Sequence, residues 1–189
     1  MLTVQIFKSF TPEVVEILRR GGVGIIPTDT VYGLVGSLFS PQAIERIYEL
    51  KGSDKLLPVG TVLINDPVQI EHVIDAEELS RVARHWASPV SVLLEVDGRL
   101  AYIHQGHGVL AFRVPAIDEL KSLVEQTGPL ATSSANFTGR PPAETLAEAL
   151  GYFRGGVDFY VDGGNLSSRG PLKVIRVGED GIEELGVQH

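Results

Sequence analysis

The hydrophobic positions of this chain form two kinds of run that alternate along its length. Short continuous apolar runs, typical of buried strands, predict strands at 23–27, 59–64, 90–96, 109–114, 130–132, 159–161, 174–177 and 182–185. Between them, apolar residues three and four positions apart predict helices at 11–20, 40–52, 75–86, 117–126 and 143–150. Strands and helices that alternate in this way indicate an α/β protein with a mixed sheet.

Polar and conformationally special residues mark where several of these elements begin. Thr11-Pro12 and Ser40-Pro41 each place a capping side chain before a proline, which is typical of a helix start. Glu179-Asp180-Gly181 predicts a hairpin turn before the last strand. No repeat, low-complexity tract or shift in composition divides the chain, so we expect one domain over residues 1–189.

The composition is that of a folded chain with a sizeable core, because 43% of its residues are hydrophobic and 21% are charged. No apolar stretch approaches the roughly 20 residues that span a bilayer. The N-terminus lacks the basic and apolar pattern of a secretory signal. We therefore expect a cytoplasmic protein without membrane contact. The absence of cysteine excludes disulfides, thiolate metal sites and cysteine nucleophiles.

The chain is acidic, with 16 Lys and Arg against 24 Asp and Glu and a formal net charge of −8. Non-specific binding to nucleic acid depends on positive charge near the phosphates, so an acidic chain is poorly suited to it. Net charge does not exclude a local basic cavity.

The segment 27–34, PTDTVYGL, follows the predicted strand at 23–27. Open α/β sheets bind their ligands beside strand ends of this kind. The hydroxyls of Thr28 and Thr30, a carboxylate and the phenol of Tyr32 could together hydrogen-bond a small polar ligand. The same residues could instead form a turn that caps its own backbone, and composition alone slightly favours that turn.

The segment 130–139, LATSSANFTG, is a second place where a strand runs into polar side chains. Hydroxyls and backbone N–H groups in such a loop, here around Thr132, Ser134 and Asn136, can cradle a phosphate without a lysine. An ordinary polar loop is the alternative. Because both segments leave a strand, we expect them to share a cleft.

Two sets of basic residues could meet an anion. Arg113 interrupts the apolar run around FRVP, and a buried arginine is costly unless it meets a group such as a carboxylate. An arginine on the solvent face of an alternating strand fits the spacing equally well. Lys51 and Lys55 follow a predicted helix and could face a phosphate or simply complement the helix dipole.

A metal hydrolase is only weakly indicated by His104 and His107. No carboxylate lies at ligand spacing from them, and an exposed turn is the commoner setting for such a pair. We therefore expect no metal-ligating residues.

Four motifs together resemble one known family. PTDTVYGL, a following helix that ends in KG, FRVP and ATSSANFTG occur in the order and spacing of the YrdC/YwlC family, over roughly residues 10–185. The resemblance implies a YrdC-like twisted mixed sheet with flanking helices and a concave ligand site. It also implies an L-threonylcarbamoyladenylate synthase, a nucleotidyltransferase that makes threonylcarbamoyl-AMP from L-threonine, bicarbonate or CO2, and ATP. The product serves the t6A37 modification of tRNA, so tRNA and tRNA-modification proteins are implied partners.

The resemblance further implies two subsites and a catalytic strategy. Substrate positioning and charge neutralisation would carry catalysis, with no side chain as covalent nucleophile and with Mg²⁺ entering on ATP. The implied L-threonine subsite consists of Thr28, Thr30, Tyr32, Arg113 and Thr132. The implied nucleotide subsite consists of Lys51, Ser53, Lys55, Ser91, Ser134 and Asn136.

The sequence departs from the family pattern mostly on the nucleotide side. Ser53 replaces the arginine of a KxR motif, and Leu57 replaces a polar or basic residue. Ser91 keeps a hydroxyl where threonine is usual, whereas Leu172 and Gly186 stand where serine and arginine are common. These changes leave a second hypothesis open, namely a non-catalytic or altered-specificity YrdC paralogue that binds nucleotide or double-stranded RNA.

Overall fold

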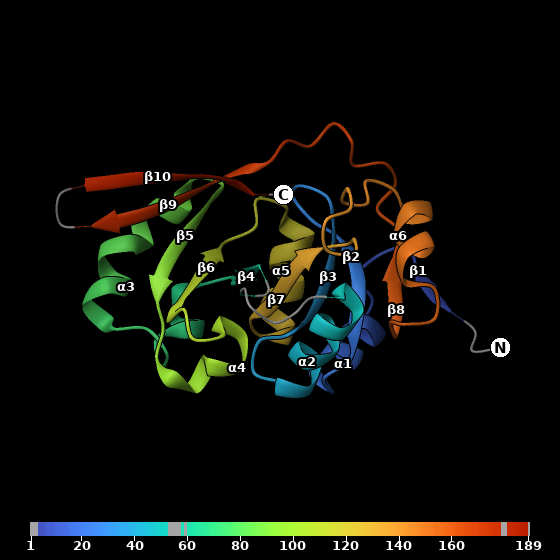
Figure 1. Cartoon of the computed structure of the whole chain (residues 1–189), viewed down its shortest axis with the longest axis horizontal. Helices are drawn as coiled ribbons and strands as arrows, with labels where there is room; N and C mark the ends of the chain where they lie inside the picture. Colours follow the sequence, from blue (N-terminus) through green and yellow to red (C-terminus); the bar gives the residue numbers. More distant parts are fainter. Residues whose placement is uncertain (1–3, 53–57, 59, 179–180, 189) are drawn as a thin grey trace.

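Ten strands form one mixed sheet in the part of the chain that the computed structural model describes, residues 4–52, 58, 60–178 and 181–188 (Figure 1). Their order across the sheet is β1-β8-β2-β3-β7-β4-β6-β5-β9-β10. The strands are β1 (Gln5–Phe7), β2 (Val23–Pro27), β3 (Tyr32–Ser37), β4 (Thr61–Leu63), β5 (Val90–Glu95), β6 (Val109–Arg113), β7 (Leu130–Ser134), β8 (Phe159–Val161), β9 (Leu172–Gly178) and β10 (Gly181–Gln188).

The sheet is mixed, as the sequence predicts. Parallel pairs are β1–β8, β2–β8, β4–β6 and β5–β9, and the remaining neighbours are antiparallel. In its centre, β7 lies between β3 and β4, so that Thr132 stands opposite both Val35 and Thr61. Residues from three distant parts of the sequence are thereby placed side by side.

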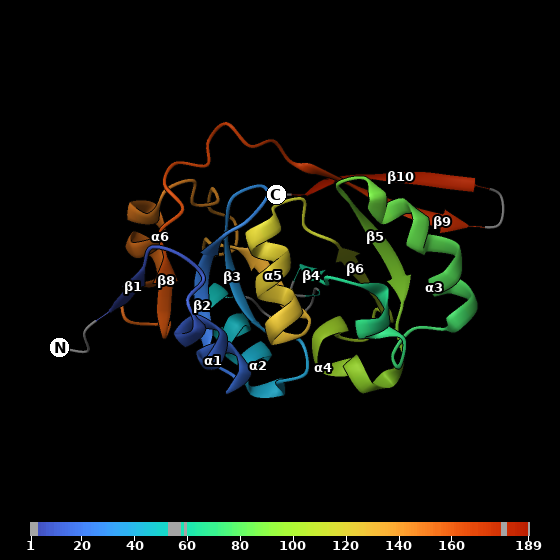
Figure 2. The same ribbon diagram turned by 180° about the vertical axis from the view of Figure 1, so that it is seen from behind.

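Helices cover both faces of the sheet (Figure 2). They are α1 (Pro12–Arg19), α2 (Pro41–Lys51), α3 (Ala76–Val82), α4 (Ala101–His104), α5 (Asp118–Thr127) and α6 (Leu146–Phe153), with short 3-10 turns at Pro67–Ile70, Ala83–Ala87 and Gly98–Leu100. Ile25 of β2 packs into the core under α2 and α6, and the next residue, Ile26, packs into the core under α1 and α5. Burial on both faces explains why this strand is a continuous apolar run instead of an alternating one.

The structure also corrects several expected boundaries. The helix predicted at 143–150 begins only at Leu146, because Thr145 is its N-cap and forms a capping box with Glu148. The helix predicted at 75–86 ends at Val82 and continues as a 3-10 turn. The short elements β1 and α4 were not predicted, and neither was the strand β3 within and beyond the PTDTVYGL segment. The turn residues Glu179 and Asp180 lie outside the described residues. No helix in the described part of the chain has the length and apolar character needed to cross a membrane.

Candidate functional site

The Thr28–Val31 turn joins β2 to β3 and is held by its own hydroxyl groups. The Thr28 hydroxyl donates to the Val31 carbonyl at 2.7 Å and accepts from the Thr30 backbone N–H at 3.2 Å. The Thr28 and Thr30 hydroxyl oxygens are themselves 3.2 Å apart. Both side chains are buried. The backbone-capping turn proposed from composition therefore forms, and Thr28 takes a larger part in it than Thr30.

Gly33 lets this turn approach the end of β7. In the sheet register Gly33 is paired with Ser134. A Cβ atom on Gly33 would lie 2.7 Å from the Thr132 Oγ1 atom and 2.8 Å from the Thr28 Cγ2 atom, closer than carbon atoms tolerate. Glycine at this position allows hydroxyls from β7 and from the turn to share one space.

Arg113 ends β6 and is buried, with 2% of its surface exposed. Its Nε atom lies 3.5 Å from the Oδ2 atom of Asp29, whose side chain is also buried. Burial lowers the pKa of Arg113, and the nearby Asp29 carboxylate raises it again. The solvent-facing alternative for this arginine is thus excluded, and its charge is balanced by a carboxylate from the PTDTVYGL turn.

Asp29 is itself fixed by the backbone at the start of α5. Its Oδ1 atom accepts hydrogen bonds from the N–H groups of Ala116 and Ile117, at 3.1 and 3.2 Å. The carboxylate is therefore held by one oxygen while the other faces Arg113. The sequence indicates a carboxylate in this turn but does not pair it with Arg113, because the two residues are far apart in the chain.

The five residues predicted to bind threonine line a single small hollow (Thr28, Thr30, Tyr32, Arg113 and Thr132). Ser134 lines it as well, and so do two residues that sequence analysis missed, Thr61 and Gln188. The hydroxyl-rich turns and the arginine thus meet, as expected of a shared cleft. No ligand role for these residues follows from the geometry alone, and those roles stay predictions.

The phenol of Tyr32 braces a neighbouring loop. Its hydroxyl donates to the Gly164 carbonyl at 2.8 Å and accepts from the Gly163 N–H at 2.9 Å. Burial raises the pKa of this phenol, so it stays protonated at neutral pH. Tyr32 lines the hollow, and its hydroxyl is bonded to Gly163 and Gly164, which do not line it.

Lys51, Ser134 and Asn136 form a second cluster beside the hollow. The Lys51 Nζ atom donates to the Ser134 carbonyl at 2.7 Å and to the Asn136 Oδ1 atom at 2.8 Å. The Ser134 hydroxyl donates to the same Asn136 oxygen at 2.7 Å. Burial lowers the pKa of Lys51 from 10.5 to about 8. A cation surrounded by neutral oxygens is a suitable partner for a phosphate.

The end of α2 positions this lysine. Gly52 adopts a left-handed conformation with φ of 60° and ends the helix directly after Lys51. Thr138 then caps the helix, because its backbone N–H donates to the Lys51 carbonyl at 3.0 Å. The SANFTG loop is therefore packed against the end of the helix that carries the lysine.

One further described residue of the predicted nucleotide subsite, Ser91, lies in the sheet and not in this cluster. Ser91 is fully buried in β5, opposite Val174 of β9, and its hydroxyl has no hydrogen-bond partner within the described residues. It does not line the hollow. Ser53 and Lys55 lie outside the described residues, as does Leu57. The nucleotide roles of Ser53, Lys55 and Ser91 stay predictions.

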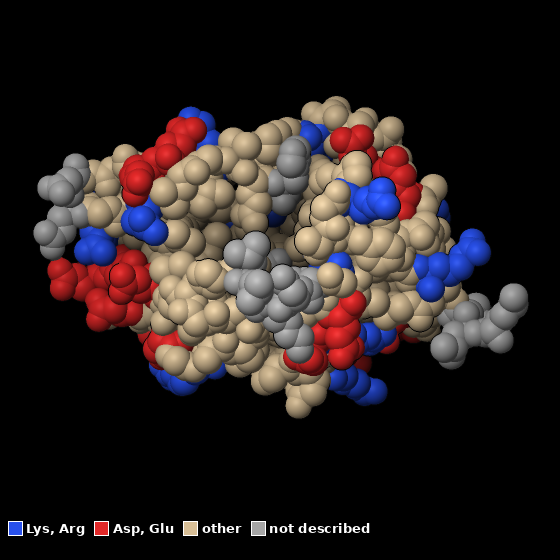
Figure 3. Space-filling view, viewed as in Figure 1, with Lys and Arg blue, Asp and Glu red and all other residues tan. Residues whose placement is uncertain are grey.

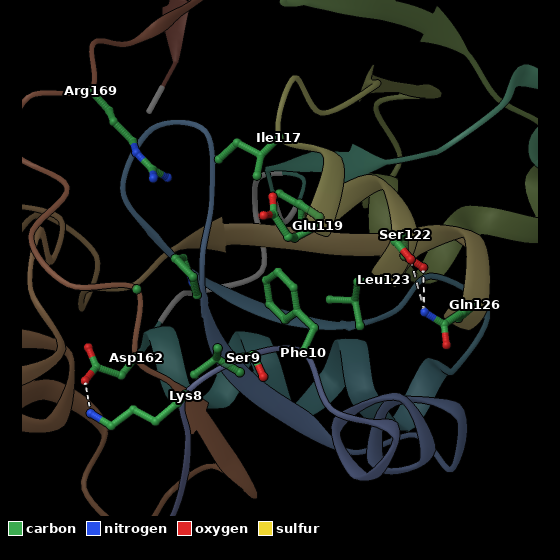
Figure 4. A pocket seen from close by; sticks show the side chains of 14 residues that line it. Lys8, Ser9, Phe10, Ile117, Glu119, Ser122, Leu123, Gln126, Asp162 and Arg169 are labelled. Atoms are coloured by element: carbon green, nitrogen blue, oxygen red, sulfur yellow. Dashed lines mark hydrogen bonds and ion pairs between the residues drawn. The ribbon is translucent and has the colours of Figure 1, made fainter.

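A larger cleft, of about 500 Å³, lies next to Pro27 and is distinct from this hollow (Figure 4). Phe10, Ile117 and Leu123 give it an apolar floor, and an ion pair of 2.6 Å between Lys8 and Asp162 lies at its rim. It contains none of the residues predicted to bind threonine or nucleotide. In the described residues, no group of three His, Asp or Glu side chains is arranged to hold a metal ion.

Comparison with known proteins identifies the family. A family model described as telomere recombination, which covers Sua5, YciO and YrdC, matches residues 16–185. The chain belongs to the Sua5/YciO/YrdC family. The resemblance inferred from the four motifs is thereby confirmed.

Curated family members of similar length carry the name threonylcarbamoyl-AMP synthase. The protein of Hahella chejuensis is 32% identical over 162 residues, which are 82% of this chain and 86% of that protein. The protein of Nitrosococcus oceani is 34% identical over 165 residues, which are 84% of this chain and 88% of that protein.

Solved structures support the fold. P. abyssi Sua5 complexed with L-threonine has a TM-score of 0.82 and 26% identity, over 97% of this chain and 56% of the Sua5 chain. E. coli YciO has a TM-score of 0.75 and 22% identity, over 99% of this chain and 96% of the YciO chain. The predicted YrdC-like mixed α/β sheet is confirmed.

Proposed function

We propose that this chain is an L-threonylcarbamoyladenylate synthase that uses L-threonine, bicarbonate or CO2, and MgATP. The observation that carries the proposal is the buried Arg113 within a hollow lined by threonine hydroxyls, next to the Lys51 cluster. A guanidinium in a confined polar pocket suits an amino-acid carboxylate, and an adjoining cation suits a phosphate. The two substrates that must react would then be held side by side.

In this proposal the reaction proceeds in two steps. The amine of threonine attacks the carbon of CO2, and loss of a proton leaves a carbamate. A carbamate oxygen then attacks the α-phosphorus of ATP, and pyrophosphate leaves. The protein would act by positioning the carbamate in line with the phosphate and by neutralising the charge that develops there. Mg²⁺ would enter bound to ATP as part of the substrate, and the product would serve tRNA modification.

The test is threonine-dependent release of pyrophosphate. Purified protein with MgATP, bicarbonate and L-threonine should release pyrophosphate, and omission of threonine should abolish the release. L-Alanine, which has no hydroxyl, should support the reaction poorly if the hydroxyl-lined hollow recognises the side chain. Arg113→Met combined with Asp29→Asn, which removes both charges of the buried pair, should lose the activity. Absence of threonine-dependent pyrophosphate would reject the proposal.

A second candidate function is a non-catalytic or altered-specificity paralogue, and Gly186 favours it. The family commonly has an arginine at the position that we assign to Gly186. In this chain the residue has a φ of 140° and follows a register shift after Glu184 in β10. Side chains other than hydrogen rarely adopt this φ, so the backbone itself is suited to glycine there. Loss of one charged phosphate contact costs about 1.5–3 kcal/mol, which would weaken nucleotide binding considerably.

Lys173, a possible substitute for the missing arginine, is engaged in an ion pair. Its Nζ atom lies 2.8 Å from the Glu184 carboxylate on the β9–β10 ribbon, and the side chain is largely exposed.

The face shown in Figure 3 offers little support for the double-stranded RNA form of this second candidate. The acidic and basic side chains on it lie mostly near its edges, in mixed groups, around a wide central area with few charged side chains. RNA binding with a steep salt dependence, and without pyrophosphate release, would favour the second candidate.

A further inference from the structure

The C-terminal strand ends at the hollow that Arg113 lines. β10 is the last strand of the sheet, and its end, at Gln188, lies beside the turn between β2 and β3 (Figures 1 and 2). Gln188, the last residue of β10, lines the same hollow as Thr30 and Arg113. The Thr61 hydroxyl donates a hydrogen bond to its Oε1 atom at 2.5 Å. A residue from the edge of the sheet thus contacts a strand near its centre.

An irregularity in β10 precedes this contact. The pairing of β10 with β9 shifts between Glu184 and Gly186, and then continues to Gln188 opposite Leu172. A bulge of this kind increases the local twist and re-aims the residues that follow. Val187 is 62% exposed, whereas Gln188 is partly buried. Gln188 is thus the one residue of β10 that is not exposed, and it lines the hollow.

With Gln188 in place, the hollow is too small for an amino acid. Its volume is about 10 Å³, which is the room needed for about one water molecule. The Gln188 carboxamide offers Thr61 the kind of oxygen acceptor that a substrate carboxylate would offer. Displacement of this side chain would make room for an amino acid beside Thr61 and Arg113.

The geometry points to Gln188 as a closing residue of the amino-acid subsite, whose carboxamide competes with the substrate for Thr61 and the space beside Arg113. The inference rests on the proposed function, because the ligand is taken to be L-threonine. The apparent affinity of a ligand falls in proportion to the fraction of the protein that is open. One neutral hydrogen bond that must first break corresponds to a reduction of about two- to tenfold.

The end of β10 can move without disturbing the core. The residues of β10 before Gln188 are exposed, and the ion pairs of the ribbon, Lys173–Glu184 and Arg176–Glu183, lie before the register shift. Exposed strand segments with few buried contacts open at little cost in free energy. Separation of residues 186–188 from their partners at the start of β9 would therefore leave the rest of the sheet intact.

Calorimetric titration with L-threonine tests the inference. Gln188→Ala should bind threonine about two- to tenfold more tightly than the wild type, because the competitor is removed. Gln188→Glu should bind it at least tenfold more weakly, because a carboxylate beside Arg113 mimics the anion of the substrate. Val187→Ala, a change at an exposed neighbour on the same strand, should bind threonine like the wild type. Unchanged or weaker binding by Gln188→Ala would overturn the inference.

A measurement without ligand separates this inference from the proposed function. Nuclear Overhauser effects between the Gln188 side-chain amide and the Thr61 methyl group should be present in the free protein, and threonine should remove them. Their absence from the free protein overturns the inference, whatever the binding data show. If threonine binds to neither the wild type nor Gln188→Ala, the proposed function fails. The closing contact is then judged by the Overhauser effects alone.

Discussion

The two cations of the candidate site are held in opposite ways. Arg113 is buried next to a carboxylate, with its Nε atom 3.5 Å from Asp29. Lys51 is half-buried, and its hydrogen-bond acceptors among the described residues are neutral oxygens of Ser134 and Asn136. The pairing with Asp29 holds the permanently charged guanidinium of Arg113 in one orientation. The arrangement at Lys51 leaves a positive charge with no carboxylate partner among the described residues, and burial has lowered its pKa to about 8.

This difference fits two kinds of ligand group. An amino-acid carboxylate carries a single charge and needs directional hydrogen bonds, which a fixed guanidinium provides. A polyphosphate carries several charges and can itself supply a counter-charge to Lys51. If Arg113 and Lys51 each serve a different ligand, removal of one cation should weaken the binding of one ligand only.

The largest effect is expected for Arg113→Met, which should weaken threonine binding by at least ~100-fold, or about 3 kcal/mol. ATP binding should change less than about twofold, because Lys51 is untouched. Separate calorimetric titrations with each ligand measure both. The single substitution leaves Asp29 buried without a counter-ion, so Arg113→Met combined with Asp29→Asn is the matched control. Recovery of threonine binding in that double variant would show that Arg113 is not the carboxylate anchor.

Lys51→Met should weaken ATP binding by roughly ten- to hundredfold, or about 1.5–3 kcal/mol, because a charged contact to phosphate is lost. Threonine binding in the absence of ATP should stay within about twofold of the wild type. Separate calorimetric titrations with threonine and with ATP measure both affinities. An equal loss of both affinities would break the comparison, since the two subsites would then act as one unit.

The pH dependence of ATP binding sharpens the comparison further. The pKa of Lys51 in the folded protein, about 8, lies below its ordinary value of 10.5, so the cation is present below pH 8 and lost above it. ATP affinity should therefore fall by up to about tenfold per pH unit above pH 8. Lys51→Arg should show no such fall, because a guanidinium stays charged. A flat wild-type profile between pH 7 and 9.5 would contradict the assignment.

The same shift has a consequence for the ligand-free protein. Between pH 8 and 10.5 the unfolded chain holds the Lys51 proton more tightly than the folded one. The contribution of this residue to the free energy of unfolding should therefore rise with pH across that range. Urea unfolding of wild type and Lys51→Met, measured at two pH values within this range, isolates the contribution of Lys51.

Gly33→Ala should have an intermediate effect, concentrated on the threonine side. The new methyl group would meet Thr132 and Thr28 at 2.7 and 2.8 Å, so these side chains must shift. We expect a loss of about 1–3 kcal/mol in unfolding free energy and weaker binding of threonine than of ATP. Gly98→Ala is the matched control, because a Cβ atom there meets nothing within 4 Å. Equal destabilisation by both substitutions would point to a backbone effect.

The smallest effect is expected for Lys173→Ala. Lys173 forms an exposed ion pair with Glu184 on the β9–β10 ribbon, and such pairs contribute about 0–1 kcal/mol. ATP affinity should change less than about twofold. A loss as large as that of Lys51→Met would mean that Lys173 takes over the role of the arginine that Gly186 lacks.

Much of the fold and of the candidate site was predictable from local sequence. The apolar run at 23–27 and the cap at Ser40-Pro41 act over a few residues, and β2 and α2 form where they predict them. Thr30 and Ser134 stood out because each lies in a polar segment directly after an apolar run. The strand β3 was harder to foresee, since its first residues belong to a motif that also contains a polar turn.

The residues that the sequence could not reveal act through distant contacts. Asp29 is ordinary within its turn, and only the approach of β6 and α5 makes it the counter-ion of Arg113. Thr61 and Gln188 carry no local signal, because their contact depends on how the sheet brings β10 near β4. Local hydrogen bonding and apolar spacing therefore determined the elements and the candidate chemistry. The burial of Arg113, its charge balance and the closure of the hollow were decided by tertiary packing, because each depends on groups that meet only once the sheet has formed.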